Sequence, residues 1–166
     1  MSLLISQCIA IGNALPHTPL VNRNRRSEMP NGIDLILTDH RTVDALLAEF
    51  DETGNATVIG QVVCELKAHD DAEQAALYPM VGEIMGNAAM IERSSIAHSA
   101  VKKQIDALTT LEGAPLVDAF RALRKIVRQH VADEEKNILP ALGDAATQQQ
   151  LELLGARILQ AKQRVG

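Results

Sequence analysis

The chain has 166 residues and a net charge of −5 at pH 7, and no long basic run offers a surface for a phosphate backbone. Aromatic residues make up 2% of the chain and Trp is absent, so base stacking on aromatic platforms is not expected. No apolar run reaches the roughly 20 residues that span a bilayer. We therefore expect one globular domain with neither a nucleic-acid partner nor a membrane anchor.

The first 30 residues differ from the rest in pattern. Residues 3–15 are apolar, but the positive charges at Arg23, Arg25 and Arg26 follow this stretch, whereas a signal peptide has its charges in front. Residues 1–30 are therefore interpreted as a tail or irregular lead-in, and residues 31–166 as the folded domain. The expected compartment is the cytoplasm.

Glycine and proline divide the next part of the chain into helices. Ile33–Glu52 is predicted as a helix that stops at a Thr-Gly-Asn sequence. Thr57–Tyr78 is predicted as a second helix, ended by Pro79 because proline cannot continue a helix. Met80–Asn87 contains two glycines and is interpreted as a connection.

The remaining chain predicts three more helices. Ala88–Leu111 is the third, Pro115–Leu139 is the fourth and is closed by Pro140, and Thr147–Arg164 is a shorter fifth. No stretch alternates with the period of a strand. The predicted fold is all-α: an up-down-up-down four-helix bundle with a short C-terminal fifth helix and an irregular N-terminal lead-in.

The apolar stripe of each long helix is interrupted near its middle by one histidine. A single histidine on an apolar face is usually a core residue, but here there are four: His40, His69, His98 and His130. Their distances from the helix ends agree to within about 3 Å at 1.5 Å per residue, so antiparallel helices place all four in one layer.

Two glutamates belong to the same layer. Glu73 and Glu134 each follow a histidine by four residues, and residues at this spacing share a helix face. Burying two carboxylates among imidazoles is costly without a cation. An internal hydrogen-bonded or ion-pair network is the alternative. A shell of imidazoles and carboxylates suits iron, manganese or zinc, and six ligands suit two metals better than one.

These residues resemble the hemerythrin-like, or HHE cation-binding, family. The matching segments are Asp39–Leu47, His69–Glu73 running on to Leu77-Tyr78-Pro79, then His98, and His130–Glu135 running on to Ile138-Leu139-Pro140. The resemblance implies a non-haem di-iron centre with an oxo or hydroxo bridge, and it places iron ahead of manganese or zinc. It implies that the ligands are His40, His69, Glu73, His98, His130 and Glu134, with the two glutamates bridging the irons.

The chain departs from the family pattern on the third helix. Hemerythrins proper have a second histidine one turn from the first, but the positions one turn either side of His98 are Ser94 and Lys102. Two six-coordinate irons would then keep two open positions. Asp70 could fill one of them or be a solvated carboxylate, and Asp44, one turn after His40, is a further candidate.

The open positions favour a small ligand as partner: O₂, peroxide or nitric oxide. The leading hypothesis is a hemerythrin-like protein that reacts with or senses such a ligand, or that handles iron. The alternatives are a di-iron enzyme that decomposes peroxide in a catalase-like reaction, and a metal-stabilised helical interaction module. The sequence names no protein partner.

Overall fold

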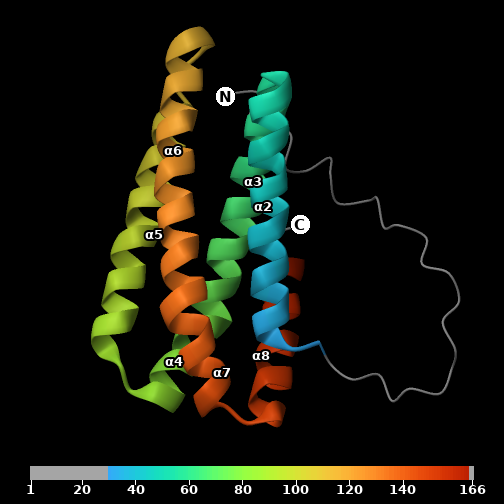
Figure 1. Cartoon of the computed structure of the whole chain (residues 1–166), viewed down its shortest axis with the longest axis vertical. Helices are drawn as coiled ribbons and strands as arrows, with labels where there is room; N and C mark the ends of the chain where they lie inside the picture. The colour runs from blue at the N-terminus through green and yellow to red at the C-terminus, as the bar shows by residue number, and fades with distance from the viewer. Residues whose placement is uncertain (1–29, 165–166) are drawn as a thin grey trace, which may run out of the picture.

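The computed structural model describes residues 30–164, and all regular structure in that range is helical (Figure 1). Helix α2 spans Gly32–Thr53 and is followed by α3 (Ala56–Ala72), α5 (Ala88–Leu108) and α6 (Gly113–Asp133). These helices run side by side as a bundle, which confirms the predicted all-α fold. Apart from Pro30, the expected lead-in lies outside the described residues.

Side-chain caps explain where the helices begin. The side chain of Asn31 accepts a hydrogen bond from the amide of Ile33, and Asn55 and Asn87 cap α3 and α5 in the same way. Gly54 ends α2 with a φ of 63°, a conformation that glycine adopts without strain. The third helix ends at Leu108, three residues before the predicted end, and the fourth begins at Gly113.

The prediction that Pro79 and Pro140 end their helices is wrong. A π-helical turn, Glu73–Leu77, joins α3 to α4 (Tyr78–Met85), and a second, Glu134–Ile138, joins α6 to α7 (Leu139–Ala145). Each proline lies in the first turn of the α-helix that follows, where its missing N–H is tolerated. The predicted connection over Met80–Asn87 is therefore mostly helix.

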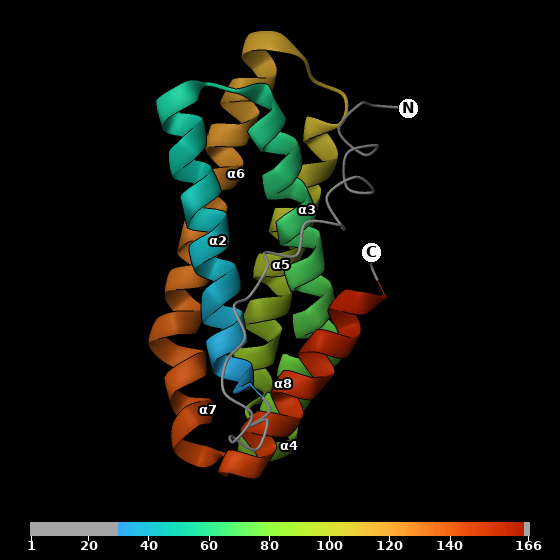
Figure 2. The ribbon, with the colours of Figure 1, turned by 90° about the vertical axis from the view of Figure 1, so that its right-hand side faces the viewer.

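The fifth helix, α8 (Gln148–Gln163), packs obliquely on the outside of the bundle (Figure 2). It begins with a capping box formed by Thr147 and Gln150. Its buried side chains include Leu154 and Ile158, and it contacts α2, α3 and the first π turn. Gly155 lies so close to the Pro30 carbonyl that any Cβ there would clash, which shows how closely α8 approaches the start of α2. Leu151 is also buried, whereas Leu159 is 38% exposed.

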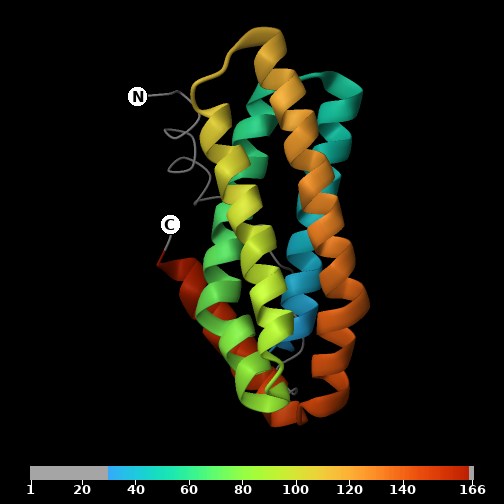
Figure 3. The ribbon, with the colours of Figure 1, turned by 90° about the vertical axis from the view of Figure 1, so that its left-hand side faces the viewer.

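The core consists of two apolar clusters. One contains Phe50, Phe120 and Leu123 in the half of the bundle near the α2–α3 turn, and the other contains Leu77, Leu142 and Leu154 near α4, α7 and α8. Figure 3 shows the α2–α3 turn at one end of the bundle and α4, α7 and the start of α8 at the other. A layer of buried polar side chains lies between them. Among residues 30–164, no helix has the length and apolar character needed to cross a bilayer.

Candidate metal centre

The polar layer contains the six residues that the sequence singled out. Two groups of four have ligand atoms within 4.8 Å of one another: His40, His69, Glu73 and Glu134 form one, and Glu73, His98, His130 and Glu134 form the other. Each long helix supplies one histidine, and both glutamates belong to both groups. Such an arrangement could hold cations in two adjacent positions, with both carboxylates shared between them.

All four imidazoles direct Nε2 into the layer. The Glu134 Oε2 atom lies 3.3 Å from His40 Nε2 and 3.6 Å from His130 Nε2. The Glu73 Oε2 atom lies 3.3 Å from His69 Nε2 and 3.1 Å from His98 Nε2. Each glutamate therefore lies between one histidine of the first group and one of the second.

Unsatisfied polar atoms show that this donor set fits a metal. Within the described part of the chain, five buried side-chain atoms have no hydrogen-bond partner, and all five belong to the layer: His40 Nε2, His69 Nε2, His130 Nε2, Glu73 Oε1 and Glu134 Oε2. A buried unpaired polar atom is costly, and native structures rarely collect several in one place. Cations coordinated by these atoms would satisfy all of them at once.

Three histidines have a carboxylate behind them. His40 Nδ1 lies 2.9 Å from Glu135 Oε1, His69 Nδ1 lies 3.5 Å from Asp39 Oδ2, and His98 Nδ1 lies 2.5 Å from Asp70 Oδ1. Such partners fix the tautomer and the ring orientation of a metal-binding histidine. Sequence reasoning missed Asp39 and Glu135, although each is adjacent in sequence to a residue of the layer.

Neither role considered for Asp70 matches its position. It belongs to neither group of candidate ligands, and it is buried rather than solvated, between His98 and Lys102. Asp44 is exposed and pairs with Arg128 Nη2 at 3.0 Å, so it also lies outside the layer. Ser94 is buried but donates to the carbonyl of Met90.

Tyr78 is a member of the layer that the sequence analysis did not identify. Its hydroxyl donates to Glu134 Oε1 at 2.5 Å and lies 2.6 Å from His98 Nε2. Five residues separate it from Glu73, which in an α-helix would place it about 140° away around the axis. The π turn removes this offset, because the amide of Tyr78 bonds to the carbonyl of Glu73 directly above it. Only the Leu-Tyr-Pro sequence, interpreted as a helix end, pointed to this position.

The two glutamates differ in their pKa. Burial raises the pKa of Glu73. Burial also acts on Glu134, but the His40 imidazole, whose Nε2 lies 3.3 Å away, and the charge of His130 outweigh it and lower its pKa to about 2. Burial raises the pKa of Tyr78, and the neighbouring Glu73 and Glu134 raise it further, so the phenol keeps its proton.

Two of the histidines are shifted in opposite directions. Burial lowers the pKa of His130 to about 4, against an attraction by Glu134. Burial opposes protonation of His98 too, but the hydrogen bonds with Asp70 and Glu73 prevail and raise its pKa to about 9. Without a metal, His98 therefore carries a proton on both nitrogens at neutral pH.

This shift predicts a pH dependence of metal binding. Because a metal must displace the Nε2 proton of His98, and because the pKa of His69 is also raised, affinity should rise at least about tenfold per pH unit from neutral pH until it levels off near the His98 pKa of about 9. Zinc affinity, measured by competition with a chelator at successive pH values, tests this. Replacing Asp70 with asparagine should move the plateau to lower pH. A plateau below pH 7 in the unmodified protein would contradict the prediction.

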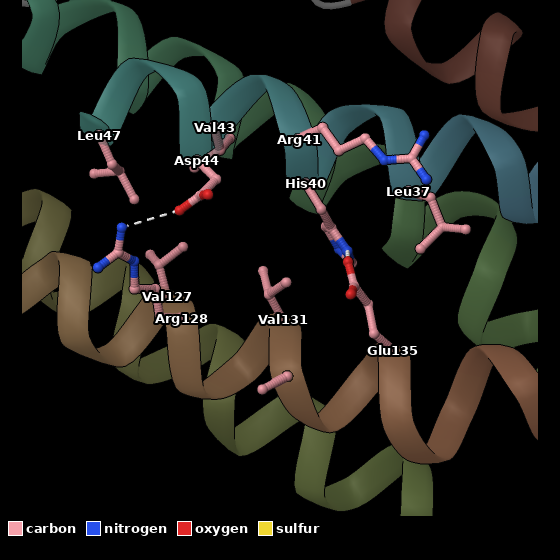
Figure 4. Close-up of a pocket in the computed structure, with 11 residues that line it drawn as sticks. Leu37, His40, Arg41, Val43, Asp44, Leu47, Val127, Arg128, Val131 and Glu135 are labelled. Atoms are coloured by element: carbon pink, nitrogen blue, oxygen red, sulfur yellow. Dashed lines mark hydrogen bonds and ion pairs between the residues drawn. The ribbon is translucent and has the colours of Figure 1, made fainter. Parts of the chain in front are cut away.

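Two hollows lie beside the first group of candidate ligands. A cavity of about 10 Å³ is lined by His40, His69 and His130 and by the apolar residues Val43, Leu66, Val127 and Val131. A surface groove of about 530 Å³ between α2 and α6 has His40, Val43, Val127 and Val131 in common with that cavity (Figure 4). In the figure, Arg41 and the Asp44–Arg128 ion pair lie along the groove, while His40 and Glu135 point toward one another across it.

The chain is similar to a known sequence and to a solved structure. The sequence is 28% identical over 138 residues to a protein described as a DNA nickase from Nostoc sp. (strain PCC 7120 / SAG 25.82 / UTEX 2576). That match covers 80% of this chain but only 39% of the relative. The crystal structure of a hemerythrin HHE cation-binding-domain protein from Mycobacterium kansasii superposes with a TM-score of 0.72. It is 19% identical, with 82% of this chain and 88% of that chain covered, and it supports the fold.

The family follows from the sequence match to the Hemerythrin HHE cation binding domain, which spans residues 31–142. This range includes all four histidines and both glutamates of the layer. The resemblance stated from the sequence is thus confirmed, and the chain belongs to the hemerythrin HHE family of metal-binding proteins.

Proposed function

We propose that this protein holds two iron ions in the polar layer and binds or senses a small molecule such as O₂, peroxide or nitric oxide. The observation that carries the proposal is the pair of four-residue groups that share Glu73 and Glu134. Imidazole and carboxylate ligands suit iron. A pair of irons, when bound, would supply the electrons for reversible binding or reduction of such a ligand.

The surroundings of the layer support a small and uncharged ligand. The 10 Å³ cavity has room for about one water-sized molecule, and aliphatic side chains together with imidazole rings form its walls. The apolar clusters on both sides of the layer exclude water from it. The chain itself would thus provide the dry pocket in which a weakly polar ligand competes with water.

Peroxide decomposition is the second candidate, and Tyr78 favours it. Disproportionation of two peroxide molecules to O₂ and two water molecules requires protons to move between oxygen atoms. The Tyr78 hydroxyl is a buried hydrogen-bond donor aimed at Glu134, inside the layer. Release of O₂ by the iron-loaded protein on addition of peroxide would support this candidate over simple ligand binding.

We do not extend DNA nicking to this chain. The activity is that of a protein more than twice as long as the matched part, which is 39% of it. A net charge of −5 also disfavours binding of a polyanion.

The ligand site can be tested at Val127, which lines both the cavity and the groove and is 2% exposed. A Val127→Leu substitution adds a methylene to the passage. If the overpacking raises the entry barrier by about 1–3 kcal/mol, ligand association slows roughly 5- to 150-fold. Val127→Ala should have the opposite effect. The measurement is stopped-flow association of nitric oxide with the diferrous protein.

Val101→Ala is the matched control, because it removes the same two methyl groups from a buried valine that does not line this cavity. Its association rate should equal that of the unmodified protein. Iron analysis should give about two irons per chain for every variant. Equal rates for both Val127 variants would show that the ligand does not use this cavity.

A further inference from the structure

Two chains of polar contacts lead outward from the layer. In the first, Asp39 lies behind His69, and its other oxygen accepts from Lys162 Nζ. In the second, Asp70 Oδ1 lies 2.5 Å from His98 Nδ1, while Asp70 Oδ2 lies 2.8 Å from Lys102 Nζ. Each aspartate thus bridges an imidazole and an ammonium group.

The two series of polar contacts lead to different groups of candidate ligands. His69 belongs to the first group of candidate ligands and His98 to the second, so each cation position has one histidine in such a chain. A neutral histidine that presents Nε2 to a metal carries its proton on Nδ1. The aspartate behind the ring accepts this proton in a hydrogen bond and so fixes which nitrogen faces the metal.

The lysines keep the aspartates in place. Asp39 and Asp70 are 8% and 7% exposed, and a carboxylate this deeply buried needs a counter-charge. Without the lysine, the carboxylate lowers its desolvation cost by turning toward water, and the imidazole then loses its hydrogen-bond acceptor. The ammonium group therefore acts on the histidine through the aspartate, without touching either cation position.

Both lysines lie outside the pattern of candidate ligands. Lys162 is on α8, beyond the residues 31–142 that define the family match. Lys102 stands one turn after His98 on α5, and its side chain reaches across to Asp70 on α3.

We propose that Lys162 and Lys102 are positioning residues of the metal centre, each holding one aspartate against the Nδ1–H of one histidine. The inference rests on the proposed metal site and deepens it. The two lysines contribute unequally: the Lys162 side chain is 29% exposed and that of Lys102 is 57% exposed. Because solvent and salt screen an exposed ion pair, Lys162 has the larger effect and Lys102 the more salt-sensitive one.

The test uses the full chain loaded with zinc, a diamagnetic ion that accepts the same ligand types. In protein labelled with ¹⁵N, exchange of each imidazole Nδ1–H with water is measured by NMR. Lys162→Met should speed exchange at His69 about tenfold or more and leave His98 unchanged, and Lys102→Met should do the reverse with a smaller factor. Lys162→Arg, which keeps the charge, should restore slow exchange at His69.

Two controls separate positioning from general loosening. Lys103→Met removes an exposed lysine next to Lys102 and should change neither signal. Leu151→Ala weakens the packing of α8 at the end far from Lys162. It should lower the melting temperature without changing exchange at His69.

The outcomes distinguish the inference from the proposed function. If the unmodified protein takes up no zinc, the metal site fails and the inference fails with it. If it takes up zinc normally but neither lysine variant changes the exchange of its own histidine, only the inference is overturned. Equal acceleration of His69 and His98 in both variants would also overturn it, because a merely structural role has that effect.

Discussion

Replacing Glu73 with alanine is expected to remove both metal ions rather than one. Glu73 is fully buried and belongs to both groups of candidate ligands, as does Glu134. Each position would lose one of its four ligand residues, and the remaining glutamate could not hold two cations together. Iron content after reconstitution should fall from about two per chain to near zero, for Glu134→Ala as well as for Glu73→Ala.

Asp70→Ala and Asp44→Ala are the comparison variants. Asp70 lies behind His98, so its loss should weaken binding by about 10- to 100-fold without abolishing it at saturating iron. Asp44 lies on the surface with Arg128, and its loss should change nothing. If Asp70→Ala empties the protein as fully as the glutamate variants do, the assignment of Glu73 and Glu134 as the shared ligands is wrong.

Folding provides a check on these variants. Without metal, the layer contains the unpaired carboxylate oxygen of Glu73 in a buried position. Removing that carboxylate relieves the desolvation cost of Oε1, but it also leaves a cavity and takes a partner from His69 and His98, so metal-free Glu73→Ala should melt below the metal-free unmodified protein. The apolar clusters on both sides of the layer are unchanged, so a folded and metal-free variant is still the expected product, and circular dichroism can establish its helix content.

Removing the metal should lower the melting temperature by about 10 °C or more. Two sites, each at a free metal concentration near 100 times its Kd, contribute roughly 5 kcal/mol of stability together. For a domain of this size each kcal/mol corresponds to about 2–4 °C. The five unsatisfied atoms of the layer are the structural origin of the difference, because they have partners only when the cations are bound.

The helix content should change far less than the melting temperature. The apolar clusters on both sides of the layer do not depend on the metal, so the bundle remains assembled without it. Thermal melting of metal-free and reloaded protein at several free metal concentrations tests the prediction. A melting temperature that does not depend on metal would mean that the buried histidines and glutamates satisfy one another.

The layer could be predicted from sequence because its cause is local. A histidine in an apolar stripe, followed after four residues by a glutamate, shows that both side chains lie on the buried face of one helix. The lengths of the antiparallel helices then give the position of each histidine along the bundle axis. His69 with Glu73, and His130 with Glu134, share helix faces in the structure as this reasoning requires.

The partners behind the histidines depend on tertiary packing and could not be predicted in this way. Asp39 meets His69 from another helix, and Lys162 reaches Asp39 only because α8 folds back along the bundle. No spacing within one helix reports such contacts. The prolines misled for a different reason: the rule that proline ends a helix assumes α-helical geometry, and a π turn precedes both Pro79 and Pro140.

The two π turns also set the phase of the helices on either side of the layer. Each turn begins at a shared glutamate and adds one residue to the helical repeat, which rotates the following segment by about 100° relative to an uninterrupted α-helix. The direction in which the buried face points can therefore differ between the helix before each turn and the helix after it. Deleting Gln74 would place Tyr78 four residues after Glu73, so an α-helical turn would keep the two side chains on one face. Without a deletion, an α-helical turn would rotate Tyr78 about 100° away from its present position, while the residues before the turn kept their places. The π turns thus determine where the segments after Glu73 and Glu134 lie around the helix axis, whereas His69 and His130 precede the turns.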